Sequence, residues 1–168
     1  MAIATQMPVE EYLHAGFDPE CEFVDGEVLE RNIGETDHAW CVTRAMFALA
    51  NREKDLGVHV LPSLTIRMTS THYRIADIAL LRLDAPNEHV ITHPPFACAE
   101  VLSTEDLMYR MHQKVRDYIK FGVKYVWLID PQTRQMFEHS AEGVRQIVDT
   151  LRIQNTTVEI PLSEFFSE

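Results

Sequence analysis

The sequence is poor in cysteine, in positive charge and in long apolar stretches. Its three cysteines, Cys21, Cys41 and Cys98, are odd in number and widely spaced, so they suggest neither a disulfide framework nor a paired CxxC zinc site. No apolar run reaches the length of a transmembrane helix, and the opening MAIATQMPVEEYL lacks the basic segment and apolar stretch of a secretion signal. We therefore expect a cytoplasmic protein with no membrane partner.

Positive charge is scarce in total but locally concentrated. The net charge of −11 does not favour a protein that coats nucleic acid by charge alone. The first 37 residues carry ten acidic residues against Arg31 alone, whereas the stretch 110–124 carries five basic residues against Asp117 alone. A locally basic helix on an acidic protein can still bind a phosphate group.

The order of the expected helices and strands predicts one α/β domain. The Asp25-Gly26 pair inside CEFVDGEVLE predicts a tight β-hairpin. Long helices are expected over 36–54 and from Ser103 or Thr104 to Phe121, each followed closely by a glycine. Strands are expected at 58–62, 63–69, 73–83, 96–103 and 124–130, followed by a weaker hairpin over 134–150. With 168 residues, too few for two ordinary domains, we expect residues 1–168 to form a single mixed β-sheet flanked by helices.

Two acidic residues interrupt runs that otherwise look like buried strands. Glu100 is the only charge in FACAEVLS, and Asp77 is the only charge at the centre of YRIADIALLR. An ionised carboxylate in such a place is costly unless it is paired, hydrogen-bonded or bound to a metal. A solvated or salt-bridged acid at a strand end explains either residue equally well on its own. Two such acids in neighbouring strands favour a functional site.

A lysine occupies the apolar stripe of the second long helix. Leu107, Met111, Lys114 and Tyr118 recur at helical spacing. Either Lys114 extends its ammonium into water from a packed stem, or it reaches the carboxylates at the end of the preceding strand. Two carboxylates with a lysine would suit Mg²⁺, which prefers oxygen ligands and keeps several waters. The metal would activate water against a phosphodiester, and the lysine would orient that water or neutralise charge on the phosphate.

Four segments resemble the motifs of a known family. CEFVDGEV resembles its YELVDGEL element, RIADIALL its PD strand and AEVLS its EVLSPS strand. QKVRDYIKFGVKYVWLIDP matches the pattern K-x-x-x-Y-x-x-x-G-V-x-x-Y-W-x-x-D-P. On these motifs nearly the whole chain resembles the Uma-two family of endonucleases, a branch of the PD-(D/E)XK restriction-endonuclease-like superfamily.

The resemblance implies a restriction-endonuclease-like fold and a role for each of four residues. Asp77 corresponds to the motif aspartate and Glu100 to the second motif acid, both as ligands of Mg²⁺ or Mn²⁺. Glu22 corresponds to the acid of the N-terminal element, as a third ligand or a contact to a water on the metal. The superfamily's lysine often follows the second acid by two residues, where this chain has Leu102. In this family the lysine is instead expected in the following helix, at Lys114.

The expected activity is hydrolysis of phosphodiester bonds in nucleic acid, with DNA favoured and a homodimer as the assembly. Two departures from the family pattern bear on this. Ala76 replaces the proline that usually precedes the motif aspartate, which removes no chemistry. Thr104-Glu105 replaces the usual Pro-Ser, and Glu105 adds negative charge near the expected phosphate path, which weakens the case for tight DNA binding.

Two other functions stay open at the level of sequence. The acidic charge favours a nuclease-like module that has no catalysis and serves as a dimeric binding or scaffold unit, whereas the complete acid–acid–lysine set favours the enzyme. Metal-dependent hydrolysis of a small phosphoester would also fit the charge. Three further residues are better explained by structure than by function: His38 as a neighbour of a helix cap, Trp127 as core, and Cys98 as a buried thiol.

Overall fold

The structure is a computed structural model that describes residues 5–31 and 35–166. Its helices are α1 (Val9–His14), α2 (Thr36–Ala50), α3 (Glu53–Leu56) and α4 (Met108–Phe121), with a 3₁₀ turn at Leu162–Glu164. Its strands are β1 (Thr5–Gln6), β2 (Cys21–Val24), β3 (Glu27–Glu30), β4 (Val58–Thr69), β5 (His72–Arg82), β6 (Ala97–Val101), β7 (Tyr125–Asp130), β8 (Gln135–Ser140), β9 (Gly143–Ile147), β10 (Thr150–Arg152) and β11 (Glu159–Pro161).

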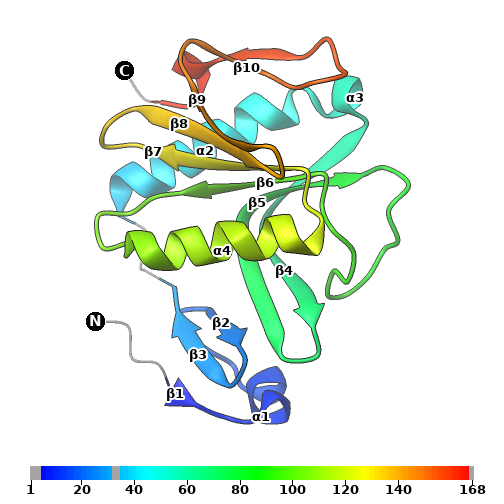
Figure 1. Ribbon diagram of the computed structural model, residues 1–168, viewed down its shortest axis with the longest axis vertical. Coiled ribbons are helices and arrows are strands. Elements are labelled where there is room, and N and C mark those ends of the chain that lie inside the picture. Colours follow the sequence, from blue (N-terminus) through cyan, green and yellow to red (C-terminus); the bar gives the residue numbers. More distant parts are fainter. Residues whose placement is uncertain (1–4, 32–34, 167–168) are drawn as a thin grey trace.

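Nine of the described strands form one mixed β-sheet in the order β1-β3-β2-β5-β6-β7-β8-β9, with β4 paired to β5. The pair β6–β7 is parallel and the other pairs of this sheet are antiparallel. Helix α4 lies across one face of the sheet and α2 across the other (Figure 1). This arrangement confirms the expected mixed sheet flanked by helices.

Each long helix buries one stripe against its face of the sheet. Helix α2 buries Cys41, Ala45, Ala48 and Leu49, which pack in one cluster with strand residues that include Ile78 and Trp127. Helix α4 buries Met111, Lys114, Val115 and Tyr118, of which Val115 and Tyr118 pack on Cys98 and Val126. Gly122 ends α4 with φ 110°, a left-handed conformation that a residue with a Cβ rarely adopts.

The N-terminal hairpin is held against β5 by a small aromatic core. Its turn contains Asp25 and Gly26 at positive φ, as the Asp-Gly pair predicts. Tyr12 of α1 stacks on Phe23 of β2, and both rings contact Tyr73 of β5. Because strand residues alternate between faces, Glu22 points away from Phe23 and toward α4. The aromatic core therefore fixes the direction of the Glu22 carboxylate.

Several boundaries differ from the sequence expectations. Helix α4 begins at Met108, so Ser103 and Thr104 do not cap it, and Leu107, expected in the buried stripe, is 49% exposed at the N-cap. Helix α2 ends at Ala50 and a separate α3 follows, where one helix to residue 54 was expected.

The two strands expected over 58–69 are the single strand β4, which tolerates Pro62 because its other edge has no partner strand among those described. The β10–β11 pair was not expected. In the described part of the chain, no helix combines the length and apolar character needed to cross a membrane.

Candidate active site

A break in strand pairing along β5 creates the place for a site. One edge of β5 pairs with β4, while the other edge pairs with β2 at His72–Tyr73 and with β6 only from Ile78 to Leu80. In the register of the described strands, residues 74–77 lie between these two partners. The backbone of Ile75 is satisfied there by side chains: its N–H donates to Glu22 Oε1 (3.0 Å) and its carbonyl accepts from Lys114 Nζ (2.7 Å).

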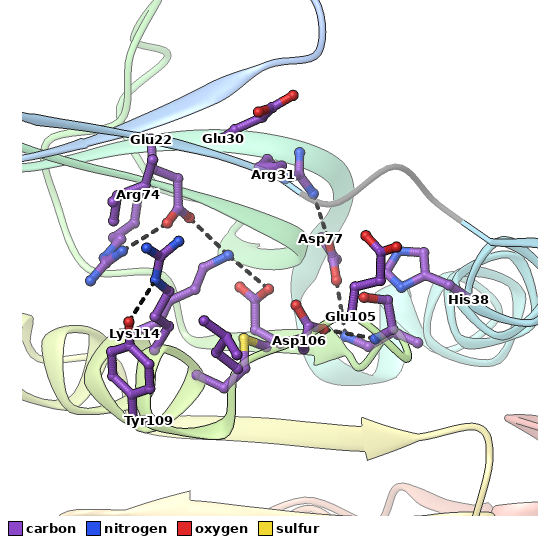
Figure 2. Close-up of a pocket in the computed structure, with 17 residues that line it drawn as sticks. Glu22, Glu30, Arg31, His38, Arg74, Asp77, Glu105, Asp106, Tyr109 and Lys114 are labelled. Atoms are coloured by element: carbon purple, nitrogen blue, oxygen red, sulfur yellow. Dashed lines mark hydrogen bonds and ion pairs between the residues drawn. The ribbon is translucent and has the colours of Figure 1, made fainter. Parts of the chain in front are cut away.

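The four residues expected from the sequence meet at this break. Glu22, Asp77, Glu100 and Lys114 come from β2, β5, β6 and α4 and line one cavity of about 630 Å³ (Figure 2). Lys114 Nζ lies 2.8 Å from Glu22 Oε1 and 2.9 Å from Glu100 Oε2. Lys114 is only 7% exposed, so its ammonium does not extend into water. Of the two explanations for this lysine, the structure shows contact with the carboxylates.

The electrostatics of the site separate Glu100 from Glu22. Burial raises the pKa of Glu100 to about 7, with Asp77 and Glu22 adding to the rise and Lys114 opposing it. Burial would also raise the pKa of Glu22, but Lys114 and Arg74 lower it to about 2. Burial opposes the charge on Lys114, yet Glu100, Glu22 and Asp77 raise its pKa. Near neutral pH, Glu22 and Lys114 are therefore ionised while Glu100 titrates.

Tyr118 of α4 forms a hydrogen bond with Glu100. Its hydroxyl donates to Glu100 Oε1 at 2.7 Å, and the side chain is fully buried. Burial, followed by the neighbouring Glu100, raises the pKa of Tyr118 well above its usual value, so the hydroxyl keeps the proton that it donates. Tyr118 follows Lys114 by one helical turn, so both side chains reach the Glu100 carboxylate from the same face of α4.

Asp77 has a cationic partner that sequence reasoning missed. Its Oδ1 accepts a hydrogen bond from the guanidinium of Arg31, and its Oδ2 accepts one from the backbone N–H of Val101 at 2.9 Å. Arg31 also bonds the exposed Glu20 at 3.1 Å. Burial lowers the pKa of Arg31, but Asp77, Glu100 and Glu22 raise it by more, so it stays charged. The available signal was that Arg31 is the lone basic residue among the first 37.

Arg74 is the second missed cation. It is buried at the N-terminal end of β5, donates from Nη1 to Glu22 Oε2 (2.8 Å) and donates from Nη2 to Asp117 Oδ2 on α4 (2.6 Å). His72 contacts the same Asp117 oxygen at 3.0 Å. Both oxygens of Glu22 are thus occupied by Lys114, Ile75 and Arg74, which makes Glu22 a holder of cations more than a free ligand.

The remaining residues set aside on sequence grounds divide in two. His38, on the first turn of α2, lines the cavity, and its buried Nδ1 finds no hydrogen-bond partner within residues 5–31 and 35–166. Trp127 is fully buried and donates from Nε1 to Glu138 Oε2 at 2.9 Å, which confirms it as core. Cys98 is fully buried and burial raises its pKa well above the usual value, as expected of an inert thiol.

The carboxylates of the cavity are suitable ligands for a divalent cation, but they are not arranged to hold one in this structure. Six carboxylates line the cavity against four arginine and lysine side chains, and carboxylate oxygen is the ligand that Mg²⁺ prefers. Within the described ranges, however, no three His, Cys, Asp or Glu side chains are grouped so as to hold a metal ion. Asp77 and Glu100 are therefore the right type of ligand for a metal ion, and Asp77 Oδ1 becomes available to one when Arg31 moves away.

Comparison with known proteins identifies the family. Residues 9–168 match the family model Uma2, described as "Putative restriction endonuclease". The chain belongs to the Uma2 family. The resemblance drawn from the sequence motifs is thereby confirmed, and membership supports a nuclease. No curated protein matches the chain.

The fold of this Uma2 chain is also found in a solved structure. It is similar to the crystal structure of a "putative nuclease belonging to DUF820" from Anabaena variabilis ATCC 29413, with a TM-score of 0.83. The match covers 95% of this chain and 97% of that one at 14% sequence identity. At this identity the likeness shows the fold alone.

Proposed function

We propose that this Uma2 chain is an endonuclease that hydrolyses phosphodiester bonds of nucleic acid, most of all DNA, with Mg²⁺ or Mn²⁺. One observation carries the proposal: Lys114 lies between Glu22 and Glu100 in a cavity that also contains Asp77. Acids from three strands and a lysine from a helix converge at a break in the sheet, and Glu22 and Lys114 contact charged partners there as well as the backbone of Ile75. Family membership supports the same reaction class.

Asp77 and Glu100 would hold the cation, and Glu22 would act through Lys114. When bound, Mg²⁺ or Mn²⁺ would polarise the scissile phosphate and lower the pKa of water. Glu100 carries a proton over part of the neutral range, so its ligation would require that proton to leave. Glu22, with both oxygens engaged, holds the Lys114 ammonium at the position where the reaction needs a positive charge.

Lys114 is a donor in this proposal and not a base. Because its pKa is raised, it stays protonated at neutral pH and has no lone pair to accept a proton. Its ammonium already contacts the Ile75 carbonyl, Glu22 and Glu100, so one of its three N–H groups can orient the attacking water or bind a phosphate oxygen once Glu100 turns to the cation. The hydrogen bonds to Ile75 and Glu100 fix Nζ before substrate arrives, which is the preorganisation that such stabilisation requires.

We further propose that residues 1–168 act as one domain in the cytoplasm and that two copies assemble as a homodimer. Cutting both strands of a duplex generally requires two active sites, which is the argument for the pair. Size-exclusion chromatography with light scattering tests it directly.

The decisive experiment is cleavage of labelled duplex DNA, single-stranded DNA and RNA in Mg²⁺ or Mn²⁺ by the wild type and by Asp77→Asn and Glu100→Gln. Each substitution keeps side-chain shape, and we expect at least ~10²-fold slower cleavage. Glu138→Gln is the matched control, because Glu138 is also a buried carboxylate, bonded to Trp127 and Arg145, but lies outside the cavity. A wild type that cuts none of the three polymers, or an Asp77→Asn variant that cuts at the wild-type rate, would reject the proposal.

A second candidate is a binding module without catalysis. It is favoured by the cation set itself, because Arg31, Arg74 and Lys114 satisfy the carboxylates of the site without a metal. The two functions differ in their response to Mn²⁺. If the chain is the enzyme, Mn²⁺ binds the folded state and raises the melting temperature of the wild type, and Asp77→Asn abolishes this rise. If the chain is a binding module without a metal site, Mn²⁺ affects the wild type and Asp77→Asn alike.

A further inference from the structure

A second cavity adjoins the candidate active site. It has a volume of about 520 Å³ and lies between the β2–β3 hairpin and α4. The two cavities have four lining residues in common: Leu29, Arg74, Tyr109 and Arg110. A polymer held at the scissile bond would therefore continue naturally from the first cavity into the second.

One face of α4 forms the wall of the second cavity. Six lining residues come from this helix: Tyr109, Arg110, Gln113, Arg116, Asp117 and Lys120. The five other than Asp117 are here called the α4 strip. At 3.6 residues per turn these positions fall within an arc of roughly 120°, beside the buried stripe that carries Lys114. From Arg110 to Lys120 the strip runs about 15 Å along the helix axis.

The cations of the α4 strip are not neutralised by neighbouring acids. Within residues 5–31 and 35–166, Arg110 bonds only the Tyr109 hydroxyl, at 3.2 Å, and Arg116 and Lys120 form no ion pair. The acid on the same helix, Asp117, is already held by Arg74 and His72. On a chain with a net charge of −11, this leaves three available cations beside the candidate active site.

Tyr109 adds an aromatic surface at the junction of the two cavities. Tyr109 is 58% exposed, although a residue with so large an apolar ring is more often buried. It precedes the first cation of the strip and lines both cavities. Exposed aromatics interleaved with a basic groove are how proteins bind single nucleic-acid strands, the rings stacking on bases and the cations holding phosphates.

We infer that the α4 strip binds the strand that flanks the scissile phosphate, with Arg110, Arg116 and Lys120 on the sugar–phosphate backbone and Tyr109 stacked on a base. The inference rests on the proposed function for the place of the cut, but the binding itself needs no metal and no catalysis. The opposite wall of the cavity carries Asp25 and Glu27, so the backbone should lie against α4 and away from the hairpin. The strip also explains how an acidic protein could engage a polyanion: the attraction is local.

Binding is tested by fluorescence anisotropy of a labelled 20-nucleotide single strand and of its duplex, in EDTA, over 25–200 mM NaCl. The test variant is Arg110→Gln/Arg116→Gln/Lys120→Gln. The matched control is Lys54→Gln/Arg67→Gln/Arg134→Gln, which lowers the net charge equally and touches neither cavity. For three phosphate contacts, the slope of log K against log[salt] should become shallower by about 2 for a single strand or nearly 3 for duplex DNA.

Tyr109→Ala separates stacking from charge. It should weaken binding of the single strand about 5- to 100-fold while leaving the salt slope unchanged. The inference is overturned if the wild type does not bind at 25 mM NaCl, or if the test and control triples weaken binding equally. Retention of wild-type binding by the test triple also overturns it.

A small substrate distinguishes failure of this inference from failure of the proposed function. Bis(4-nitrophenyl) phosphate is too short to span the α4 strip, so Arg116→Gln/Lys120→Gln, whose two residues line the second cavity and not the first, should hydrolyse it at the wild-type kcat while its KM for an oligonucleotide rises. Asp77→Asn should lose hydrolysis of both substrates but still bind the strand in EDTA. Normal hydrolysis by Asp77→Asn would reject the active site and leave the strip standing. Parallel loss of kcat on the small substrate by Arg116→Gln/Lys120→Gln would reject the strip as a separate binding surface.

Discussion

Arg31 offers the sharpest test of whether the cavity is a metal site. Its guanidinium binds Asp77 Oδ1, one of the two carboxylates proposed as ligands, so a cation can reach that oxygen only by displacing Arg31. The side chains of Arg31 and Asp77 are 21% and 8% exposed, so water screens this contact less than it screens a surface ion pair. A charge-assisted hydrogen bond of this kind contributes about 1.5–3 kcal/mol. Arg31→Gln should therefore tighten Mn²⁺ binding about 10- to 100-fold.

The same substitution should weaken the metal-free protein. Without Arg31, Asp77 keeps the Val101 N–H as its one hydrogen-bond partner among the described residues, and it lies in a cavity that already contains Glu100 and Glu22. We expect the free energy of unfolding to fall by about 1–3 kcal/mol. At a Mn²⁺ concentration ten times the wild-type Kd, the metal stabilises the wild type by about 1.4 kcal/mol and the variant by about 2.7–4.1 kcal/mol. Stability without metal and stabilisation by metal should thus change in opposite directions.

The assay is thermal unfolding across a Mn²⁺ titration, with Arg52→Gln as the control. Arg52 has nearly the same side-chain exposure as Arg31, 22%, and pairs with Glu164 outside the cavity. Arg52→Gln should lower the melting temperature and leave the Mn²⁺ response unchanged. Equal or weaker Mn²⁺ binding by Arg31→Gln would show that Arg31 does not compete with a cation at Asp77.

Three further predictions concern Glu100 and Lys114. The pKa of Glu100 is raised to about 7, so the folded chain binds this proton more tightly than the unfolded chain does. The free energy of unfolding should therefore fall by at most about 3 kcal/mol as the pH rises from 4.5 to 7. Urea denaturation across this range should show that fall, and Glu100→Gln should flatten it. For the same reason Mn²⁺ affinity should rise with pH up to about 7 and then level off, as calorimetry in two buffers can measure. Lys114→Met should slow cleavage about 10²–10³-fold and lower the free energy of unfolding by about 3–5 kcal/mol. Lys114→Arg should restore little of the cleavage rate. Cleavage is measured well below the melting temperature of each variant.

Periodicity was enough to predict which acids and which lysine turn inward. Glu100 and Asp77 stand in strands whose other residues are apolar, and Lys114 shares a helical stripe with Met111 and Tyr118, so each must face the interior if its element forms at all. Their convergence followed from the order of strand and helix along the chain. Burial of the Lys114 ammonium did not follow, since a lysine on such a stripe can also extend into water.

The cations that complete the site depend on tertiary contacts without a local signature. Arg31 lies 46 residues from Asp77, and Arg74 lies 52 residues from Glu22. Both pairs depend on how the β2–β3 hairpin lies against β5, which the sequence pattern of either segment does not specify. The predicted start of α4 was wrong for a local reason. Ser103 and Thr104 are favoured cap residues, but the Asp106 carboxylate accepts from the Ser103 N–H at 2.7 Å and fixes a turn that delays the helix to Met108.

The break in β5 pairing joins structure and chemistry in the same side chains. Lys114 satisfies the carbonyl of Ile75 as well as two carboxylates, and Glu22 satisfies the Ile75 N–H as well as two cations. A change at either residue must alter both stability and reactivity, so loss of cleavage there cannot by itself assign a chemical role. Among the described residues, neither Arg31 nor the α4 strip forms a hydrogen bond with the backbone of Ile75. Changes at Arg31 or in the α4 strip can therefore alter metal binding or strand binding and leave the hydrogen bonds of Ile75 in place, which changes at Lys114 and Glu22 cannot do.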